Sequence, residues 1–203
     1  MARKQMIEGG TKRRIMEVGG RMIFEKGYEG AGIRAIMREV GGEVGLFYYY
    51  YKTKDDLFTD VLDHFFEPYR RDFERLAAEA HERPHQALLR FFVYIKRRVR
   101  EFRALYAGSM HRTVRWAIRE QTLTEIEPYL EHILGTLIEN GAKPTMDAHT
   151  MAIFLSHGVG SCILHEDADW VDLATDDVRR TVNLIMGLDE ETSKKMFENA
   201  VTK

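Results

Sequence analysis

The sequence predicts an all-α protein with a small N-terminal part of three helices and a larger helical part behind it. Apolar residues recur at helical spacing along most of the 203-residue chain, and strand-like alternation is scarce. Only four prolines interrupt the chain. Two short helical patterns near the N-terminus are separated by the pair Gly41-Gly42, as in two helices joined by a tight turn.

The first helix is predicted from about residue 11 to residue 26, with Ile15, Gly19, Met22 and Ile23 on one face. Gly27 is placed to end this helix in a left-handed conformation. Gly19 and its neighbour Gly20 each cost a helix roughly 1 kcal/mol relative to alanine. We therefore expect another helix to cross closely at this point.

The second and third helices are short, at about residues 33–40 and 44–50, with Gly41-Gly42 between them. The apolar residues of the second helix fall on one face, which predicts that this face packs inward. Two short helices joined by a glycine turn form a helix-turn-helix pattern. We place a domain boundary after residue 53, which gives domains at 1–53 and 54–203.

Longer helices follow in the second part. Thr53 is the expected N-cap of a helix at about 54–79, and Pro84 suits the first turn of the next one. Further helices are expected at about 103–119, around Pro128 as either a start or a kink, from Asp147 to about residue 165, and at about 176–186 before Gly187. A short polar helix at the C-terminus would complete the chain.

Charge is distributed unevenly along the chain. Residues 1–54 carry 11 Lys and Arg against 6 Asp and Glu, whereas the other 149 residues carry 19 against 26. A basic N-terminal part on an acidic remainder indicates that only the N-terminal part meets a polyanion. Chance clustering is the alternative explanation of the charge distribution taken alone.

Several functional classes lack support in the sequence. No apolar run approaches the roughly 18 residues of a membrane helix, and the N-terminal residues lack the apolar core of a signal peptide. The single cysteine, Cys162, fits a reducing cytoplasm. Nucleophile-elbow, P-loop, dinucleotide and zinc-protease motifs are absent, and the histidines lack a ligand-like spacing. We expect a cytoplasmic protein with no cofactor, metal, membrane partner or enzymatic activity.

The stretch from Gly41 to Lys54 contains four consecutive tyrosines and carries the functional argument. Helical spacing predicts that Phe47, Tyr50 and Tyr51 face the other helices, which leaves Tyr48 and Tyr49 outward. Phenol hydroxyls are suitable donors to phosphate oxygens. An aromatic core without a binding role is the alternative, and we apply it to Tyr50 and Tyr51 only.

Residues 12–66 resemble the DNA-binding domain of the TetR family of bacterial transcriptional regulators. The resemblance lies in the segment ending at Gly27-Tyr28, in the isoleucine-centred second helix, and in residues 41–54. For this last segment the family signature reads Gly-x-x-x-Gly-x-Leu-Tyr-x-x-Phe-x-x-Lys. The resemblance implies a regulator that binds double-stranded DNA at a palindromic operator.

The resemblance also assigns roles to single residues. Tyr48, Tyr49 and Lys54 take phosphate-contact positions, and Arg34 takes a backbone-contact position. The positions nearest the base edges fall to Val44, Gly45 and Leu46, beside Glu43. The chain departs from the family pattern at Glu43, where a small polar residue is common, and at Leu46, where Thr is frequent. Because Val44 and Leu46 cannot donate hydrogen bonds, direct readout would depend on thymine methyl groups and backbone positioning.

For the larger domain, the resemblance implies a site for an inducing ligand and a homodimer formed through the last two long helices. Small residues at positions 158, 160, 161 and 162 would allow close helix packing, either between two copies or within one chain. Aromatic, methionine and histidine side chains are candidates to line an apolar ligand site, with ordinary core packing as the alternative: Phe65, Tyr69, Phe91, Tyr94, Tyr106, Met110, Trp116, Phe154 and His157.

The function we expect is a ligand-responsive transcriptional repressor that a small apolar or aromatic molecule releases from its operator. Ligand binding would pivot the long helix that begins near Lys54, which we take as the only covalent connection between the two domains. The alternative is a helical protein-interaction module with weakened or lost DNA binding, favoured only by Glu43, Val44 and Leu46.

Overall fold

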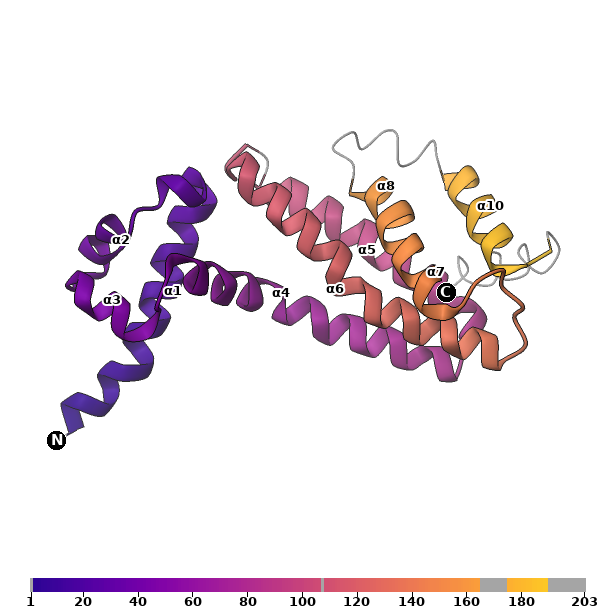
Figure 1. Ribbon diagram of the computed structural model, residues 1–203, viewed down its shortest axis with the longest axis horizontal. Helices are drawn as coiled ribbons and strands as arrows, with labels where there is room; N and C mark the ends of the chain where they lie inside the picture. The colour runs from indigo at the N-terminus through magenta and orange to yellow at the C-terminus, as the bar shows by residue number, and fades with distance from the viewer. Residues whose placement is uncertain (1, 107, 165–174, 190–203) are drawn as a thin grey trace. The chain divides into compact units, whose positions relative to one another are not determined.

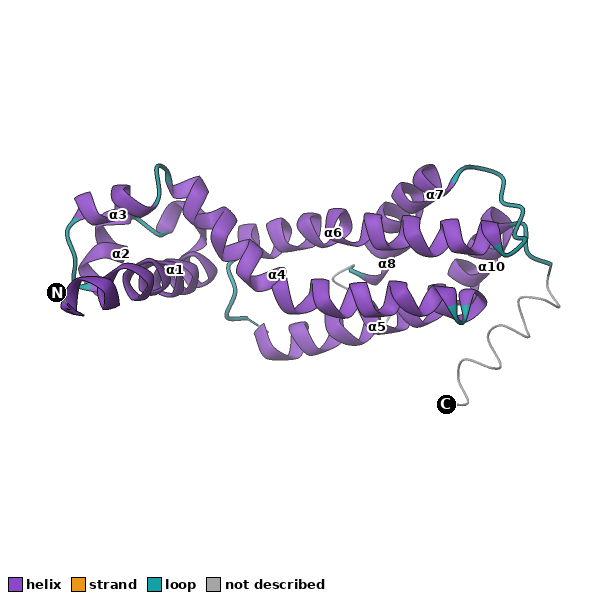
Figure 2. Ribbon diagram, turned by 90° about the horizontal axis from the view of Figure 1, so that it is seen from below, coloured by secondary structure: helices purple, strands orange, loops and turns teal. Residues whose placement is uncertain are grey.

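A computed structural model describes residues 2–106, 108–164 and 175–189. Every regular element in these ranges is helical (Figure 2). The elements, labelled in Figure 1, are α1 (Ala2–Gly30), α2 (Ile33–Val40), α3 (Val44–Tyr50), α4 (Lys54–Ala78), the 3-10 turn η1 (Glu79–His81), α5 (Pro84–Tyr106), α6 (Arg112–Glu139), α7 (Ala148–Leu155), the π-helical turn η2 (Ser156–Gly160), α8 (Ser161–Ile163) and α10 (Thr175–Met186).

The chain divides into two compact units. The first, which we call the N-terminal unit, comprises Met1–Pro68 together with Tyr106–Ile118. The second, the body unit, comprises Tyr69–Leu105 and Arg119–Lys203. The predicted domain boundary, after residue 53, lies directly before α4, whereas the first compact unit continues to Pro68.

A close helix crossing accounts for the paired glycines of α1. A Cβ atom at Gly19 would lie 2.7 Å from Leu57 Cδ2, and one at Gly20 would lie 3.1 Å from Val61 Cγ1. Leu57 and Val61 belong to the first turns of α4, so α4 crosses α1 at the glycines as predicted. The absence of two side chains allows this approach and offsets their poor helix propensity.

Helix α1 is broken at Gly27, whose φ of 78° and ψ of 166° are not helical. The Phe24 carbonyl instead accepts a hydrogen bond from the His111 backbone N–H at 2.7 Å. A Cβ atom at Gly27 would lie 2.5 Å from His111 Nδ1, so glycine is required both by the backbone and by the neighbouring ring. His111 therefore joins the segment before α6 to the end of α1 within the N-terminal unit.

The predicted helix at 103–119 is wrong. Helix α5 ends at Tyr106, and Gly108 adopts a positive φ of 77° before α6 begins at Arg112. The chain then continues as one helix through Pro128, which is inside α6. The fully buried side chains of Ile126 and Leu130 flank this proline, and their packing stabilises the helix where proline removes one hydrogen bond.

The turn between α5 and α6 also corrects the expectation that α4 is the only covalent connection. Because Tyr106–Ile118 belongs to the N-terminal unit, the chain passes between the units at α4, after Leu105 and after Ile118. Met110, Val114 and Ile118 are buried, and the His111 N–H donates to the Phe24 carbonyl within the N-terminal unit.

The body unit is built from the second half of α4 with α5 and α6, which lie alongside one another in Figures 1 and 2, and from α7, α8 and α10. Its core includes Phe73, Phe91, Leu134, Leu155 and Ile185, which come from five helices. Asp147 caps α7 by accepting a hydrogen bond from the Thr150 N–H at 2.9 Å, as predicted.

Two further predictions extend beyond the residues that the structure describes. The helix from Asp147 is interrupted by the π-helical turn and described only to residue 164, so its predicted end at residue 165 lies outside the described ranges. The short polar helix predicted at the C-terminus also lies outside them.

Candidate nucleic-acid interface

The turn between α2 and α3 is shaped by two glycines. Gly41 is left-handed, with φ of 83° and ψ of 28°, and its N–H donates to the Met37 carbonyl at 3.0 Å. A Cβ atom at Gly42 would lie 3.0 Å from Met37 Cε and 3.2 Å from Leu46 Cδ2. The second glycine thus allows the two helices to pack closely, which gives the predicted helix-turn-helix.

One face of α3 is buried and the opposite face is exposed. Phe47 is fully buried, whereas Tyr48 and Tyr49 have relative exposures of 54% and 68%. Glu43 and Gly45 are also exposed. Tyrosine hydroxyl groups are among the donors that contact phosphate oxygens in protein–DNA complexes.

Gly45 gives the exposed face of α3 a flat region. A Cβ atom there would meet no atom within 4 Å, so no intramolecular packing requires glycine at this position. A helix without a side chain at this point can bring its backbone close to another surface. The neighbouring Val44 and Leu46 are half-buried, so they offer only part of their apolar surface to a partner.

The remaining tyrosines differ from each other. Tyr51 is 3% exposed, as expected of a packing residue. Tyr50 is half-buried, and its ring meets that of Tyr49 edge to face at 4.9 Å between centroids. Tyr50 thus supports an exposed tyrosine rather than the core of the unit.

Lys54 lies at the start of α4 and is held against the end of α1. Its Nζ donates to the Tyr28 carbonyl at 2.7 Å and lies 4.0 Å from the centroid of the Tyr28 ring. The Tyr28 hydroxyl in turn donates to Asp55. Burial and this hydrogen bond raise the pKa of Tyr28 to about 12, so the phenol remains a donor at neutral pH. Lys54 is thus pre-positioned, with three N–H donors of which Tyr28 takes one.

Exposed basic residues lie on both sides of α3 in the sequence, on α2 and between α3 and α4. Arg34, in the first turn of α2, is exposed as expected. Arg38 and Lys52, which are not among the predicted DNA-binding residues, are also exposed. In the sequence, each is a basic residue within the segment 33–54, at a position outside the apolar face that helical spacing predicts. Arg21 donates to Glu39, which ties α1 to α2.

The candidate ligand-site residues are divided between the two units. Phe65, Tyr106, Met110 and Trp116 belong to the N-terminal unit, and Trp116 is 56% exposed beneath the Arg112 guanidinium. In the body unit, the buried Phe91 and Tyr94 share a core, and the half-buried Tyr69 packs against that core. The last two candidates, Phe154 and His157, are exposed on α7 and η2. The predicted set therefore combines core residues with surface residues.

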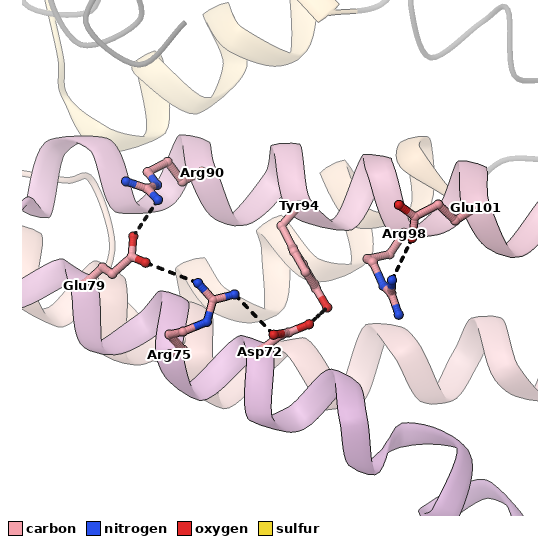
Figure 3. Close-up of polar contacts among 7 residues, drawn as sticks. All are labelled: Asp72, Arg75, Glu79, Arg90, Tyr94, Arg98 and Glu101. Atoms are coloured by element: carbon pink, nitrogen blue, oxygen red, sulfur yellow. Dashed lines mark hydrogen bonds and ion pairs between the residues drawn. The ribbon is translucent and has the colours of Figure 1, made fainter. Parts of the chain in front are cut away.

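A polar network joins α4 to η1 and α5 in the body unit (Figure 3). The Tyr94 hydroxyl donates to Asp72 Oδ2 at 2.6 Å, and Asp72 also accepts from Arg75 at 3.2 Å. Glu79 pairs with Arg75 at 3.6 Å and with Arg90 at 3.2 Å. The hydrogen bond from Tyr94 lowers the pKa of Asp72, so this carboxylate is ionised at neutral pH. The network fixes the two helices that carry Phe73 and Phe91.

The described residues contain no group of three or more His, Cys, Asp or Glu side chains arranged to hold a metal ion. Among the helices of the described ranges, none is both long enough and apolar enough to span a membrane.

Comparison with known proteins agrees with this architecture. Residues 15–61 match the family model described as bacterial regulatory proteins, tetR family. No curated protein matches the sequence. The reduced form of NemR from E. coli is 14% identical with a TM-score of 0.57, over 87% of this chain and 98% of that one.

Two further solved structures show the same fold. The hemolysin II transcriptional regulator HlyIIR is 18% identical with a TM-score of 0.53, over 88% of this chain and 98% of that one. A TetR-family regulator from Agrobacterium tumefaciens is 19% identical with a TM-score of 0.53 and the same coverage. The glycine turn, the outward tyrosines of α3 and the family match at residues 15–61 together identify the N-terminal helices as a DNA-binding helix-turn-helix like that of the bacterial regulatory proteins of the tetR family.

Proposed function

We propose that this regulator is a homodimeric repressor that binds a palindromic operator through α3 and leaves it when a small apolar or aromatic molecule binds the body unit. The observation that carries the DNA-binding part is the exposed face of α3, where Tyr48 and Tyr49 project beside the bare backbone of Gly45. In this proposal residues 1–53 form the DNA-binding domain and 54–203 the ligand-binding and dimerisation domain of a cytoplasmic protein.

Within the interface, the tyrosines and basic residues position the protein on phosphates, and the start of α3 lies at the base edges. Tyr48, Tyr49, Lys54 and Arg34 supply donors to phosphate oxygens. Val44, Gly45 and Leu46, with Glu43 at their edge, offer methyl groups and backbone to the major groove. We expect affinity to come mainly from phosphate contacts, and binding to weaken steeply with salt.

The DNA-binding part is tested by electrophoretic mobility shift with the DNA that flanks the coding sequence. We expect retardation at low salt, and about tenfold weaker binding when both tyrosine hydroxyls are removed in Tyr48→Phe/Tyr49→Phe. Tyr129→Phe, a hydroxyl removal in the body unit, is the matched control and leaves binding unchanged. Absence of retardation, with or without candidate ligands, would refute the proposal and favour the alternative of a protein-interaction module.

Exposed apolar side chains on α7 and α10 support the homodimer. Ile153 and Phe154 of α7 have relative exposures of 40% and 56%, and Leu184 of α10 has 76%. The neighbouring residues Leu155 and Ile185 are buried in the body core, so the outer faces of both helices remain to be covered. A second copy of the chain covers them in our proposal, in agreement with the family's use of its last two long helices.

The two glycines of η2, which follows α7, have different roles. A Cβ atom at Gly160 would lie 3.1 Å from Leu123 Cδ2, so Gly160 allows α6 to pack closely within one chain. Gly158 is exposed and its Cβ would meet nothing within 4 Å, which leaves it open to a partner helix. We expect Phe154→Glu/Leu184→Glu to convert the dimer to a monomer in light scattering. Val93→Glu, at an equally exposed apolar position on α5, is the control.

Ligand response rests on the family resemblance and on the aromatic core of the body unit. Phe73 packs within 5.8 Å, between ring centroids, of Phe91, Tyr94 and Tyr129. These aromatic surfaces suit an apolar or aromatic molecule. Ligand binding would favour an arrangement that binds operator poorly, and a few kcal/mol of differential affinity suffices. Simultaneous binding of ligand and operator without mutual effect would refute this mechanism.

The family and the fold are those of transcriptional regulators rather than enzymes, so no catalytic role is assigned to the polar network of α4 and α5.

A further inference from the structure

Tyr51 differs from the residue that the TetR-family signature has at its position, which is phenylalanine. The Tyr51 ring is 3% exposed and packs 5.7 Å, between centroids, from the ring of Phe47. A phenylalanine would fill the same space. The hydroxyl group is therefore an addition to the packing, and a buried hydroxyl is costly unless it is hydrogen-bonded.

The Tyr51 hydroxyl has a partner on α4. It donates to Asp60 Oδ2 at 2.6 Å, and the same carboxylate oxygen lies 2.8 Å from Lys12 Nζ of α1. Lys12 Nζ also lies 5.1 Å from the centroid of the Tyr51 ring. Three elements of the N-terminal unit, namely α1, the residue after α3, and α4, meet at this one carboxylate.

The protonation states of Tyr51 and Asp60 preserve this arrangement at neutral pH. Burial acts to raise the pKa of Asp60, but the hydrogen bonds from Lys12 and Tyr51 outweigh it and lower the pKa. Burial and the bond to Asp60 raise the pKa of the Tyr51 phenol. The phenol thus remains a donor and the carboxylate an acceptor, as a charge-assisted hydrogen bond requires.

Helix α3 needs such a contact because its own packing is limited. It has seven residues, about two turns, and Phe47 is its only fully buried side chain. A short helix held at one point can still tilt and rotate about that point. Tyr51 follows α3 directly, and its backbone N–H donates to the Phe47 carbonyl at 2.9 Å, so a fixed Tyr51 fixes the C-terminal end of α3.

We propose that Tyr51, Asp60 and Lys12 form an anchor that sets the orientation of α3, and that all three are positioning residues for DNA binding. The DNA part of this inference rests on the proposed function. Without the anchor, α3 adopts several orientations and only some present Tyr48 and Tyr49 correctly. The apparent dissociation constant then rises in inverse proportion to the competent fraction.

The test removes the Tyr51 hydroxyl and retains its ring. In Tyr51→Phe, we expect operator affinity to fall about threefold to tenfold at a temperature where the protein is fully folded. Amide hydrogen exchange in Val44–Tyr50 should accelerate, while exchange in the body unit is unchanged. Tyr50→Phe removes a hydroxyl one residue away, outside the anchor, and should leave both measurements at the wild-type level.

Two further variants separate an anchor from simpler roles. Asp60→Ala should weaken binding, and the Tyr51→Phe/Asp60→Ala double variant should be no weaker than Asp60→Ala alone, because both changes break one contact. Lys12→Met should weaken binding and accelerate exchange in α3. If Lys12→Met weakened binding and lowered the salt slope by about 0.9 while exchange stayed unchanged, Lys12 would contact phosphate directly and the anchor would be refuted.

The exchange measurement also distinguishes the anchor from the proposed function. If the wild-type protein bound no DNA while Tyr51→Phe accelerated exchange in α3, the proposed function would fail and the anchor would remain. If Tyr51→Phe matched Tyr50→Phe in both affinity and exchange, or lowered only the overall stability, the anchor would be refuted.

Discussion

Gly45→Ala separates the stability of α3 from its ability to approach DNA. Gly45 lies in the first turn of α3, its φ is not positive, and a methyl group there would meet no atom of the protein within 4 Å. Alanine is therefore accommodated without a clash. Since glycine is about 0.5–1 kcal/mol less favourable than alanine in a helix, we expect the variant to be more stable than the wild type.

The added methyl group has the opposite effect on binding if α3 lies in the major groove. It projects from the exposed face, where the proposal places the backbone against base edges. Displacing α3 from this position weakens neighbouring contacts, and the loss of one good contact is worth about 1–3 kcal/mol. We expect an operator affinity at least about tenfold lower, equivalent to about 1.4 kcal/mol.

The assay combines urea denaturation with operator titration at fixed salt. Gly135→Ala is the matched control, because Gly135 lies within α6 and a Cβ atom there also meets nothing within 4 Å. It should gain a similar stability without losing affinity. If Gly45→Ala retained wild-type affinity while gaining stability, α3 would not approach DNA at this residue, and the assignment of Gly45 to the base edges would be refuted.

Three further predictions concern the fold. Gly27→Ala should destabilise the protein by more than Gly108→Ala in urea denaturation: at both positions a positive φ, of 78° and 77°, strains a side chain by about 1–3 kcal/mol, but only Gly27 is also packed against His111. Arg70→Met should cost about 1–3 kcal/mol at pH 7, because it leaves Glu125 with the Gln121 side chain alone. Hydrogen bonding to Arg70 lowers the pKa of Glu125, so its contribution is present above the unfolded pKa, and in pH-dependent unfolding the effect of Arg70→Met should shrink as pH falls through the folded pKa. The bond to Glu131 raises the pKa of His149, so in NMR titration this histidine should lose its proton at higher pH than in Glu131→Gln, and its small stabilising effect should be present in acid and lost as pH rises through the raised pKa.

The N-terminal helices were predictable because their signals are local. The bounds of α2 and α3 agree with the prediction, since a glycine turn separates two short apolar patterns. Gly19 and Gly20 predicted a close crossing, and Leu57 and Val61 of α4 provide it. The glycine turn is recognised from residues that are neighbours in sequence. Paired glycines inside a helix have one common structural explanation, which is the close approach of another helix.

The turn between α5 and α6 was not predictable in this way. Its assignment to the N-terminal unit depends on contacts between His111 and the end of α1, more than eighty residues earlier. Gly108 is itself a residue that can end a helix, but apolar residues continue on both sides, and this continuity favoured a single helix over residues 103–119. Pro128 was ambiguous because proline is tolerated inside a helix whose neighbouring residues are well packed.

The acidic balance of the region after residue 54 conceals a basic segment. Residues 90–119 carry nine Lys and Arg with Glu101 as their only acidic residue, although the region after residue 54 is acidic as a whole. Several of these side chains pair within the body unit, as Arg90 does with Glu79 and Arg98 with Glu101. Aromatic composition was similarly uninformative, because Phe91 in the core and Phe154 on the surface have the same signal in sequence.

The contribution of Tyr106–Ile118 to the N-terminal unit has a consequence for synthesis on the ribosome. The DNA-binding helices emerge first, but the unit lacks the His111 N–H at the Phe24 carbonyl until some fifty more residues have been made. At about 5–20 residues per second, this takes about 3–10 s. During that interval the nascent chain carries α3 on an incomplete support, so the regulator gains its finished DNA-binding unit only after α5 of the body has been translated.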